Sequence, residues 1–327
     1  MLSRRGFVAA GLTPLASRRA ARAVISYPNH TIKILVGYPA GGGVDIVARL
    51  VADPMRDALS QPVIVENRAG AAAMIAAQAV ATANDAGHTL LMAAAGEVAV
   101  NQHLYKSKMP YDPLQDLVPV ALAGIVPCVV VVSAKSEVNN PSDLVAYAKA
   151  NRGKLSFSSS GVGNPQHLAG ELMNRMAGTD VLHVPYRGSA PAVTDVAAGS
   201  VTMSFSSLAA ALPLIQAGEI RAVAVTSKER MPQLPDVAPL SDGPGLNGYE
   251  LLNWFAMFAP ASTPEPNVAR LNQIVSKIIQ EPAITAKLEV QGIVPRPMTS
   301  TQLRAFVRSE SEKFGKIIEI ANIKTED

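Results

Sequence analysis

Cysteine is almost absent from this sequence of 327 residues, and Cys128 is the only one. A single cysteine cannot form an intrachain disulfide, and its place in the apolar run from Val126 to Val132 predicts a buried strand position. Histidine is also scarce, and the five histidines never form a zinc-like pair. They are His30, His88, His103, His167 and His183. We therefore expect neither a disulfide framework nor a metal centre.

Long uninterrupted apolar segments are missing too. Hydrophobic residues make up 48% of the chain, yet Pro, Gly or a charged residue interrupts every stretch before it reaches the roughly 20 residues of a membrane-spanning helix. The chain is nevertheless too apolar to be disordered. Its length and composition predict a soluble protein with one large core or, as the length favours, two lobes of ordinary size.

Basic residues are concentrated in the first 23 residues, which carry five arginines and no acidic residue. This segment has an Arg pair, a short apolar stretch and the ending Ala21-Arg22-Ala23, a pattern that predicts a signal peptide cleaved near Ala23 and a periplasmic protein. The run Ser3–Val8 resembles the twin-arginine signature, whereas the arginines near the cleavage site leave the export route open.

Removing this segment changes the formal net charge from +3 to −2, because only the five arginines are lost. The remaining sequence contains no stripe of Lys and Arg with interleaved aromatic residues. We therefore expect no nucleic-acid partner.

Strand-like and helix-like segments alternate along the rest of the chain. Apolar strands separated by helices of ten or more residues are typical of right-handed crossovers in a parallel sheet. The first set predicts strands at residues 32–36, 63–65 and 89–92, with helices from Asp45 and over 71–83. The second set predicts strands at residues 126–132, 155–158, 181–184, 201–205 and 220–225, with helices over 142–150, 165–176 and 191–198. Two amphipathic helices are expected near residues 268–280 and 301–321.

Four turns between predicted strands and helices are rich in Gly and Ser: Gly41–Gly43, Ser159–Asn164, Gly188-Ser189 and Ser206-Ser207. The carboxyl ends of parallel strands meet at one sheet edge, where helix N-termini offer free N–H groups and partial positive charge to an anion. Asn164-Pro165 is a strong helix start, because Asn caps well and Pro suits the first helical position. Each turn taken alone could merely cap its helix. Neither a Gly-Lys-Ser/Thr sequence nor spaced Rossmann glycines follow, so carboxylates are favoured over phosphates.

Several segments together resemble the substrate-binding proteins of tripartite tricarboxylate transporters, the Bug family. They are "ILVGYPAGGGVDIVARL", "QPVIVENRAGA", "MPYDP", "SSSGVGNPQHLAGEL", "HVPYRGSAPAVTDVAAGSV", "RAVAVTSKER" and "LNWFAMFAPASTP". They occur in order from about Tyr27 to the end of the chain, which makes the resemblance more specific than any single glycine turn.

The resemblance implies a type II-like periplasmic binding protein with two α/β lobes, each a mostly parallel sheet flanked by helices, and a ligand cleft between them. Residues 24–126 and 249–327 would form the first lobe and residues 127–248 the second. Such a protein is expected to bind a di- or tricarboxylate or an acidic amino acid without a cofactor. It would act as a monomer and deliver the ligand to membrane permease subunits.

The family's ligand loops correspond to Tyr38–Asp45 and Ser159–Asn164, with further contacts from the second lobe. The candidate ligand-binding residues are Tyr38, Pro39, Ala40, Gly41, Gly42, Gly43, Asp45, Glu97, Ser159, Gly161, Gly163, Asn164, His167, Tyr186, Gly188, Ser189, Ala190, Ser206 and Ser207. Asp45 is expected to cap its own helix. Departures from the family pattern at Glu97, Asn164, Pro165 and Ser206 leave the identity of the carboxylate open.

Two other functions remain open at this point. A carboxylate sensor that reports to a membrane receptor would have the same fold and site. A hydrolase is less favoured, because no Gly-x-Ser-x-Gly motif occurs and nothing supplies an orienting acid for Ser159 and His167. His167 and Glu171 lie one helical turn apart, which favours a surface pair over a shared metal. We therefore expect no catalytic residue.

Overall fold

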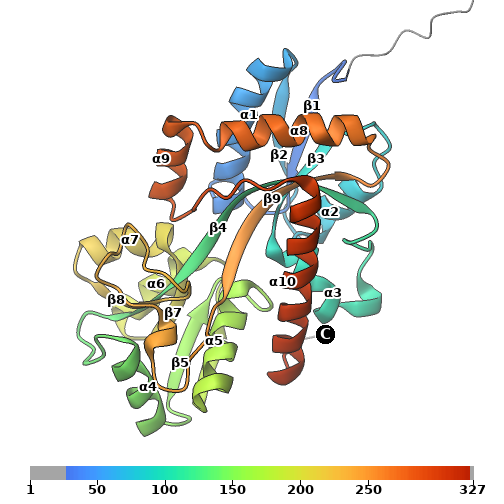
Figure 1. Cartoon of the computed structure of the whole chain (residues 1–327). Coiled ribbons are helices and arrows are strands. Elements are labelled where there is room, and N and C mark those ends of the chain that lie inside the picture. The colour runs from blue at the N-terminus through green and yellow to red at the C-terminus, as the bar shows by residue number, and fades with distance from the viewer. Residues whose placement is uncertain (1–26, 325–327) are drawn as a thin grey trace, which may run out of the picture.

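Three parallel strands form the sheet of the first lobe. In the computed structural model, which describes residues 27–324, the central strand β1 (Ile32–Val36) pairs with β2 (Val63–Asn67) and β3 (Thr89–Ala94). Helix α1 (Gly43–Leu59) packs with α8 (Glu265–Ile278) over one face, and α2 (Met74–Ala81) covers the other (Figure 1). The predicted signal segment lies outside the described residues.

The second lobe repeats this arrangement. Strand β5 (Leu155–Ser159) lies between β6 (Val181–Pro185) and β7 (Met203–Ser207), and all three are parallel. The prediction of a strand over 201–205 was two residues early, so Ser206 belongs to the strand and not to the turn. The flanking helices are α4 (Pro141–Ala150), α5 (Pro165–Ala177), α6 (Ser189–Ala198) and α7 (Leu208–Gln216), and β8 (Ile220–Val225) completes the sheet.

Two long antiparallel strands join the lobes. Residues 117–127 of β4 (Leu117–Ser133) pair with β9 (Leu252–Pro260), and residues 128–133 pair with β7 and β8. The strand order is β2-β1-β3-β9-β4-β7-β5-β6, with β8 also on β4. Each lobe therefore combines a parallel triplet with antiparallel neighbours, and β4 contributes to the sheets of both (Figure 1).

Two C-terminal segments also span the lobes. Helix α9 (Pro282–Val290), which the sequence did not predict, leads to Gly292, where an added Cβ would lie 2.8 Å from Leu208 Cβ of the second lobe. Helix α10 (Ser300–Ile320) runs down the side of the molecule and packs against α5 (Figure 1). The lobes thus share a hydrophobic cluster on the α10 side, to which Phe314 and Leu168 belong.

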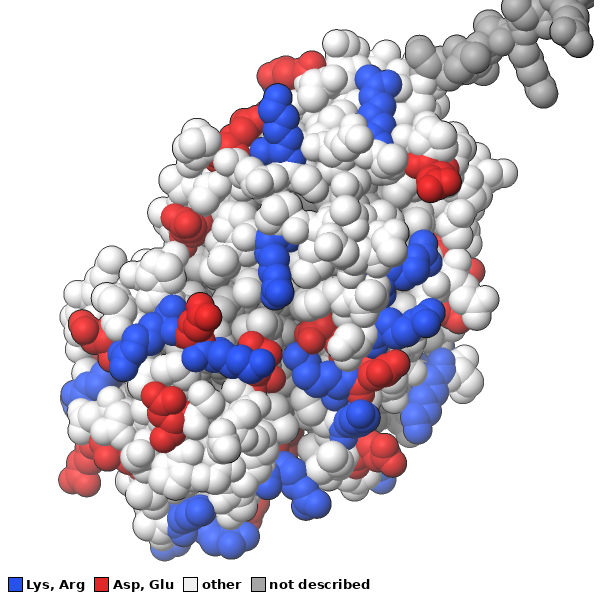
Figure 2. Space-filling view, viewed as in Figure 1, with Lys and Arg blue, Asp and Glu red and all other residues white. Residues whose placement is uncertain are grey.

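Charge of both signs is spread over the surface. Figure 2 shows Lys and Arg interspersed with Asp and Glu across the face in view, without a broad area of one sign. Among residues 27–324, no helix combines the length and apolar character needed to cross a membrane.

Candidate ligand-binding loops

Three of the turns singled out in the sequence lead out of β1, β5 and β6, whereas Ser206-Ser207 forms the end of β7 itself; these strands are parallel within their lobes. Each loop leads directly into a helix, α1, α5, α6 or α7. The carboxyl ends of β5, β6 and β7 therefore lie at one edge of the second-lobe sheet. The loop after β1 lies at the edge of the first-lobe sheet that holds the carboxyl ends of its parallel strands.

The first loop, residues 37–42, is held by the buried carboxylate of Asp45. This carboxylate accepts hydrogen bonds from Gly41 N at 2.9 Å, from Asn67 Nδ2 at 2.9 Å and from Arg49 Nε at 3.0 Å. Burial alone would raise the pKa of Asp45, but these hydrogen bonds outweigh it and hold the pKa below its usual value. Asn67 Nδ2 also donates to Tyr38 O at 3.0 Å. The prediction that Asp45 caps its own helix is wrong, because Gly42 is the N-cap and Asp45 is the third residue of α1. Asp45 instead fixes the loop before the helix, together with Asn67 and Arg49, which sequence reasoning missed.

The three glycines at residues 41–43 are required for different structural reasons. Gly41 has a φ of +83°, a conformation that side chains disfavour. At Gly43 an added Cβ would lie 3.1 Å from the ring of Phe255 on β9. Gly42 is the N-cap of α1, and Pro39, Ala40, Gly41 and Gly42 are all exposed. The backbone conformation explains the glycine at residue 41, and packing against Phe255 explains the one at residue 43. The exposed backbone of residues 39–42 remains available to a ligand.

Glu97 lies at the same sheet edge, in the turn η2 (Gly96–Val100) that follows β3. Its side chain is fully buried, and its carboxyl group accepts hydrogen bonds from Tyr38 Oη at 2.7 Å and Ala94 N at 3.0 Å. Burial raises the pKa of Glu97 to about 7 despite these hydrogen bonds. Tyr111 Oη donates to the backbone carbonyl of Glu97 at 2.6 Å. The structure therefore joins two predicted site residues, Tyr38 and Glu97, in one buried contact.

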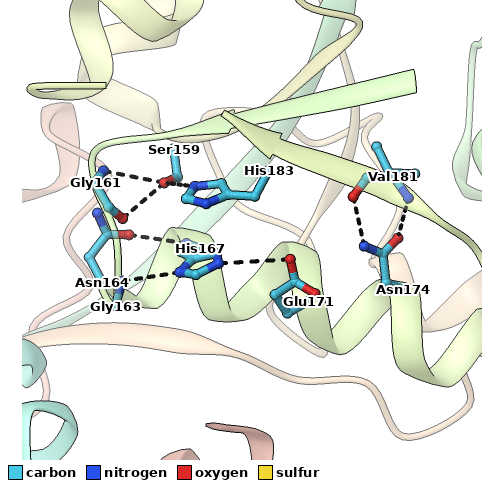
Figure 3. A network of polar contacts seen from close by, with 9 residues as sticks. All are labelled: Ser159, Gly161, Gly163, Asn164, His167, Glu171, Asn174, Val181 and His183. Atoms are coloured by element: carbon cyan, nitrogen blue, oxygen red, sulfur yellow. Dashed lines mark hydrogen bonds and ion pairs between the residues drawn. The ribbon is translucent and has the colours of Figure 1, made fainter. Parts of the chain in front are cut away.

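The second loop, residues 160–164, starts α5 as the sequence predicted. Asn164 is the N-cap and accepts a hydrogen bond from His167 N at 3.1 Å (Figure 3). Pro165 is the first residue of the helix. Asn164 Nδ2 donates to Ser160 Oγ at 2.8 Å across the loop. Gly161 and Gly163 have φ values of +139° and +76°, so the loop geometry needs glycine at both positions.

Two stacked histidines hold the two ends of this loop. The rings of His167 and His183 lie 3.7 Å apart, His167 Nδ1 accepts from Gly163 N at 3.0 Å, and Ser159 Oγ lies 2.7 Å from His183 Nε2 (Figure 3). Burial and the neighbouring His167 lower the pKa of His183 to about 3. His167 Nε2 is 3.7 Å from Glu171 Oε1, so these residues are neighbours on α5, but His167 is buried and the predicted surface pair is therefore wrong.

This cluster is poorly suited to hydrolysis. The histidine that reaches Ser159 is His183, which sequence reasoning did not consider, and its low pKa makes it a weak base. Within residues 27–324, no carboxylate bonds to the His183 ring to orient it. Ser159 is itself fully buried and donates a hydrogen bond to Gly161 O at 3.0 Å. Ser159 and His183 therefore fix the backbone of the loop at Gly161.

The other predicted residues of the second lobe divide into two groups. Ser189 joins the loop through Gln166, whose side chain accepts from Ser160 N at 2.8 Å and donates to Ser189 Oγ at 2.9 Å. In contrast, Tyr186 Oη donates to Asp195 Oδ2 at 2.5 Å, a bond that raises its pKa to about 12. Ser206 is buried and donates to the carbonyl of Ser207. Gly188, Ala190 and Ser207 lie at the starts of α6 and α7.

Gln166 was missed by sequence reasoning, although its position offered a signal. It is the second residue of α5, whose N-terminus was predicted to face the ligand. A polar side chain in such a first turn can bond to neighbouring loops.

The loops of the two lobes approach each other around α3 (Asn101–Leu104), the short helix that follows η2. A Cβ added at Gly163 would lie 2.3 Å from Leu104 Cδ1, so the second-lobe loop packs directly on the first lobe. Cavities of about 250 and 360 Å³ lie elsewhere, between α1 and α8 and between α5 and the end of α10. The chain from Glu97 in η2 to Leu104 in α3 therefore links the buried carboxyl group to the contact with Gly163.

Two α/β lobes joined by shared strands, with glycine-rich loops that lead into helix N-termini in each lobe, form the architecture of this chain. Residues 47–323 match the profile of the "Tripartite tricarboxylate transporter family receptor", and the chain belongs to this family.

Curated relatives cover nearly the whole chain. A protein from the tcbD-tcbE intergenic region of a Pseudomonas strain is 39% identical over 96% of this chain and 93% of its own length. Protein BugT of Bordetella pertussis is 34% identical over 90% of each chain. The family resemblance seen in the sequence is therefore confirmed.

Solved structures agree with this fold. Rpa4515 of R. palustris with adipate superposes with a TM-score of 0.83 at 33% identity, over 91% of this chain and 99% of that one. MatC of Rhodopseudomonas palustris with bound malate gives a TM-score of 0.78 at 30% identity, over 89% and 100%. The predicted periplasmic-binding-protein fold is confirmed, and the family assigns the chain a solute-binding role with a small molecule and transporter partners.

Proposed function

We propose that this protein captures a small dicarboxylate between the loop of residues 37–43 and the loop of residues 159–164. The observation that carries the proposal is that the loops from both lobes lead into helix N-termini, those of α1 and α5, and that the loop of residues 159–164 contacts the first lobe at Leu104. Each N-terminus can donate backbone N–H groups to one carboxylate. Adipate and malate in the two structural relatives have the same chemistry, with a carboxylate at each end.

The charge of the loops supports a ligand held by backbone groups and water. None of the four Gly- and Ser-rich turns contains Lys or Arg, and Arg187 directly precedes the Gly188-Ser189 turn. The side chain of Arg49 is already bound to Asp45, although half of it is exposed. A carboxylate would therefore be recognised mainly by N–H groups, helix dipoles and bridging water, which is enthalpically close to a direct hydrogen bond.

The proposal extends to location and partners. The protein acts in the periplasm after cleavage near Ala23, and as a monomer it delivers its ligand to membrane permease subunits. The lobes comprise residues 24–126 with 249–327 and residues 127–248, and they close over the ligand. No cofactor takes part, and the chain binds its ligand without converting it.

Titration calorimetry tests the ligand class. We expect adipate, malate or a related dicarboxylate to bind with one site per chain, and native mass spectrometry of freshly purified protein to detect a retained small acid. Inorganic phosphate serves as the control anion and is expected to give no heat at the same concentration. Saturable binding of phosphate but of no carboxylate would contradict the proposal, and turnover of a carboxylate ester would favour the hydrolase alternative.

Closure should be visible at the crossing strands. Trp254 on β9 is fully buried, pairs with Ile125 of β4 and packs edge-on against Phe306 of α10 at 5.6 Å between ring centroids. Closure bends β4 and β9 at this level, so we expect a dicarboxylate to shift the Trp254 fluorescence and to reduce the radius of gyration measured by X-ray scattering. Identical scattering curves with and without saturating ligand would show that the lobes do not close.

A further inference from the structure

A buried carboxyl group lies directly behind the proposed ligand loop. Glu97 is fully buried, and its Oε2 accepts a hydrogen bond from the hydroxyl of Tyr38, which lies in the loop after β1. Glu97 Oε1 accepts from Ala94 N, so both oxygens already have partners. A Cβ added at Gly96 would lie 3.3 Å from Tyr38 Oη, so the phenol packs closely against the glycine that begins η2. Tyr38 and Glu97 thus form a fixed donor–acceptor pair at the carboxyl ends of β1 and β3.

The number of protons in this pair determines what Tyr38 can do. A phenol has a single O–H, and an ionised carboxylate can only accept hydrogen bonds. When Glu97 is ionised, the only O–H of Tyr38 donates its hydrogen bond to Glu97. Tyr38 then has no second O–H to donate to a ligand. When Glu97 is protonated, its own O–H can donate to Tyr38 Oη, and the Tyr38 O–H becomes free to donate to a carboxylate.

Burial is the largest influence on the pKa of Glu97. Two titratable groups face it, Tyr38 from the loop after β1 and Tyr111 from the segment before β4. Tyr111 bonds to the backbone carbonyl of Glu97, and burial raises the pKa of this phenol as well. Glu97 can therefore change its protonation state near neutral pH while both phenols stay neutral.

Two other elements that pack on η2 carry titratable groups near this site. Helix α10 packs against η2, and its buried Glu310 pairs with Lys313 at 2.7 Å. From α3, which follows η2, the His103 ring bonds to Ser311 of α10. The pKa of Glu97 is accordingly set by burial and by its own hydrogen bonds.

We propose that Glu97 is a proton-linked positioning residue: its protonation releases the hydroxyl of Tyr38 to bind the ligand carboxylate, so that capture takes up a proton. This inference rests on the proposed function, because it assumes that a carboxylate binds at the loop of residues 37–43. Ionised Glu97 also opposes binding directly, since two like charges at short range repel. Affinity therefore falls as the pH rises, by up to about tenfold per pH unit once Glu97 ionises in the free protein.

The test measures adipate binding by calorimetry from about pH 6.5 to about pH 8.5, a range in which the ligand carboxylates, with pKa values near 4 to 5, stay ionised. The wild-type protein should lose affinity across this range. Buffers of different ionisation enthalpy should reveal uptake of up to one proton per ligand.

Glu97→Gln is the decisive variant, because its amide imitates the protonated acid. The Gln Nε2 can donate to Tyr38 Oη while Oε1 still accepts from Ala94 N. We expect affinity at about pH 6.5 within a few-fold of the wild type, no decline toward high pH, and no proton uptake. Tyr38→Phe removes the released donor and should weaken binding at about pH 6.5, and the decline toward high pH that remains in this variant measures the direct repulsion by ionised Glu97. Thermal unfolding verifies that each variant is folded.

The outcomes separate this inference from the proposed function. Tight adipate binding that is independent of pH in the wild type, or a decline retained by Glu97→Gln, would refute the role of Glu97 and leave the proposed function intact. If Glu97→Gln does not fold, proton uptake by the wild type still decides, since its absence refutes the role. If the wild type binds no carboxylate at any pH, both proposals fail.

Discussion

Asn164→Asp is expected to abolish dicarboxylate binding and to leave the protein folded. Asn164 caps α5 by accepting a hydrogen bond from His167 N, and an Asp carboxylate accepts this bond equally well. The new charge would face a carboxylate bound at the same helix start. Two like charges about 4 Å apart at intermediate dielectric repel by about 4 kcal/mol, so affinity should fall by about a thousandfold. Titration calorimetry with adipate measures the loss.

Asn164→Ser is the matched control, because Ser also caps helices but adds no charge. It should bind within a few-fold of the wild type. Circular dichroism should give similar melting curves for all three proteins. An unchanged affinity of Asn164→Asp would remove the loop of residues 159–164 from the binding site.

Asp45→Asn should destabilise the protein at neutral pH and weaken binding through the first loop. The change removes the charge that Gly41 N, Asn67 and Arg49 share, and a buried group that loses a charged hydrogen-bond partner typically costs about 1–3 kcal/mol. The Arg49 side chain is 52% exposed, so solvent screens its ion pair, and the bonds from Gly41 and Asn67 carry most of the effect. Urea unfolding at neutral pH measures the loss.

The effect of Asp45 should depend on pH in a defined direction. The pKa of Asp45 is lowered in the folded protein, so its contribution to stability is present above the unfolded pKa of about 4 and is lost as the pH falls through the folded value. The difference in unfolding free energy between wild type and Asp45→Asn should therefore shrink in acid. Asp53→Asn changes an exposed carboxylate on the same helix and should alter stability by less than about 0.5 kcal/mol. A difference that stays constant from neutral pH to strong acid would contradict this account.

Local signals were sufficient for many helix boundaries. Asn164-Pro165 predicted the start of α5, which is confirmed, and α5 and α6 end at the left-handed glycines Gly178 and Gly199. Such signals succeed because caps are satisfied by groups within a few residues. The extents of β4 and β9 could not be predicted in the same way, because each is longer than its most apolar stretch and is defined by its pairing partners.

Long-range contacts changed one predicted helix. The alanine-rich segment 71–83 favours helix on propensity alone, yet α2 begins only at Met74. Ala71, Ala72 and Ala73 have positive φ, and a Cβ added at Gly37 would lie 2.4 Å from Ala73 Cβ. The packing of this turn against the end of β1 therefore outweighs local preference.

The sequence by itself determined the parallel strand–helix units, the glycine and serine turns at their ends, and the family. These properties depend on local periodicity, on capping and on motifs that are contiguous in the chain. Only the tertiary structure decided that Asn67 and Asp45 share one site, because parallel pairing of β1 with β2 brings them together. The same holds for His183 with Ser159 through the pairing of β5 with β6, and for Tyr38 with buried Glu97. Burial and partner geometry set the protonation of such groups, and both arise from residues that are distant in the chain.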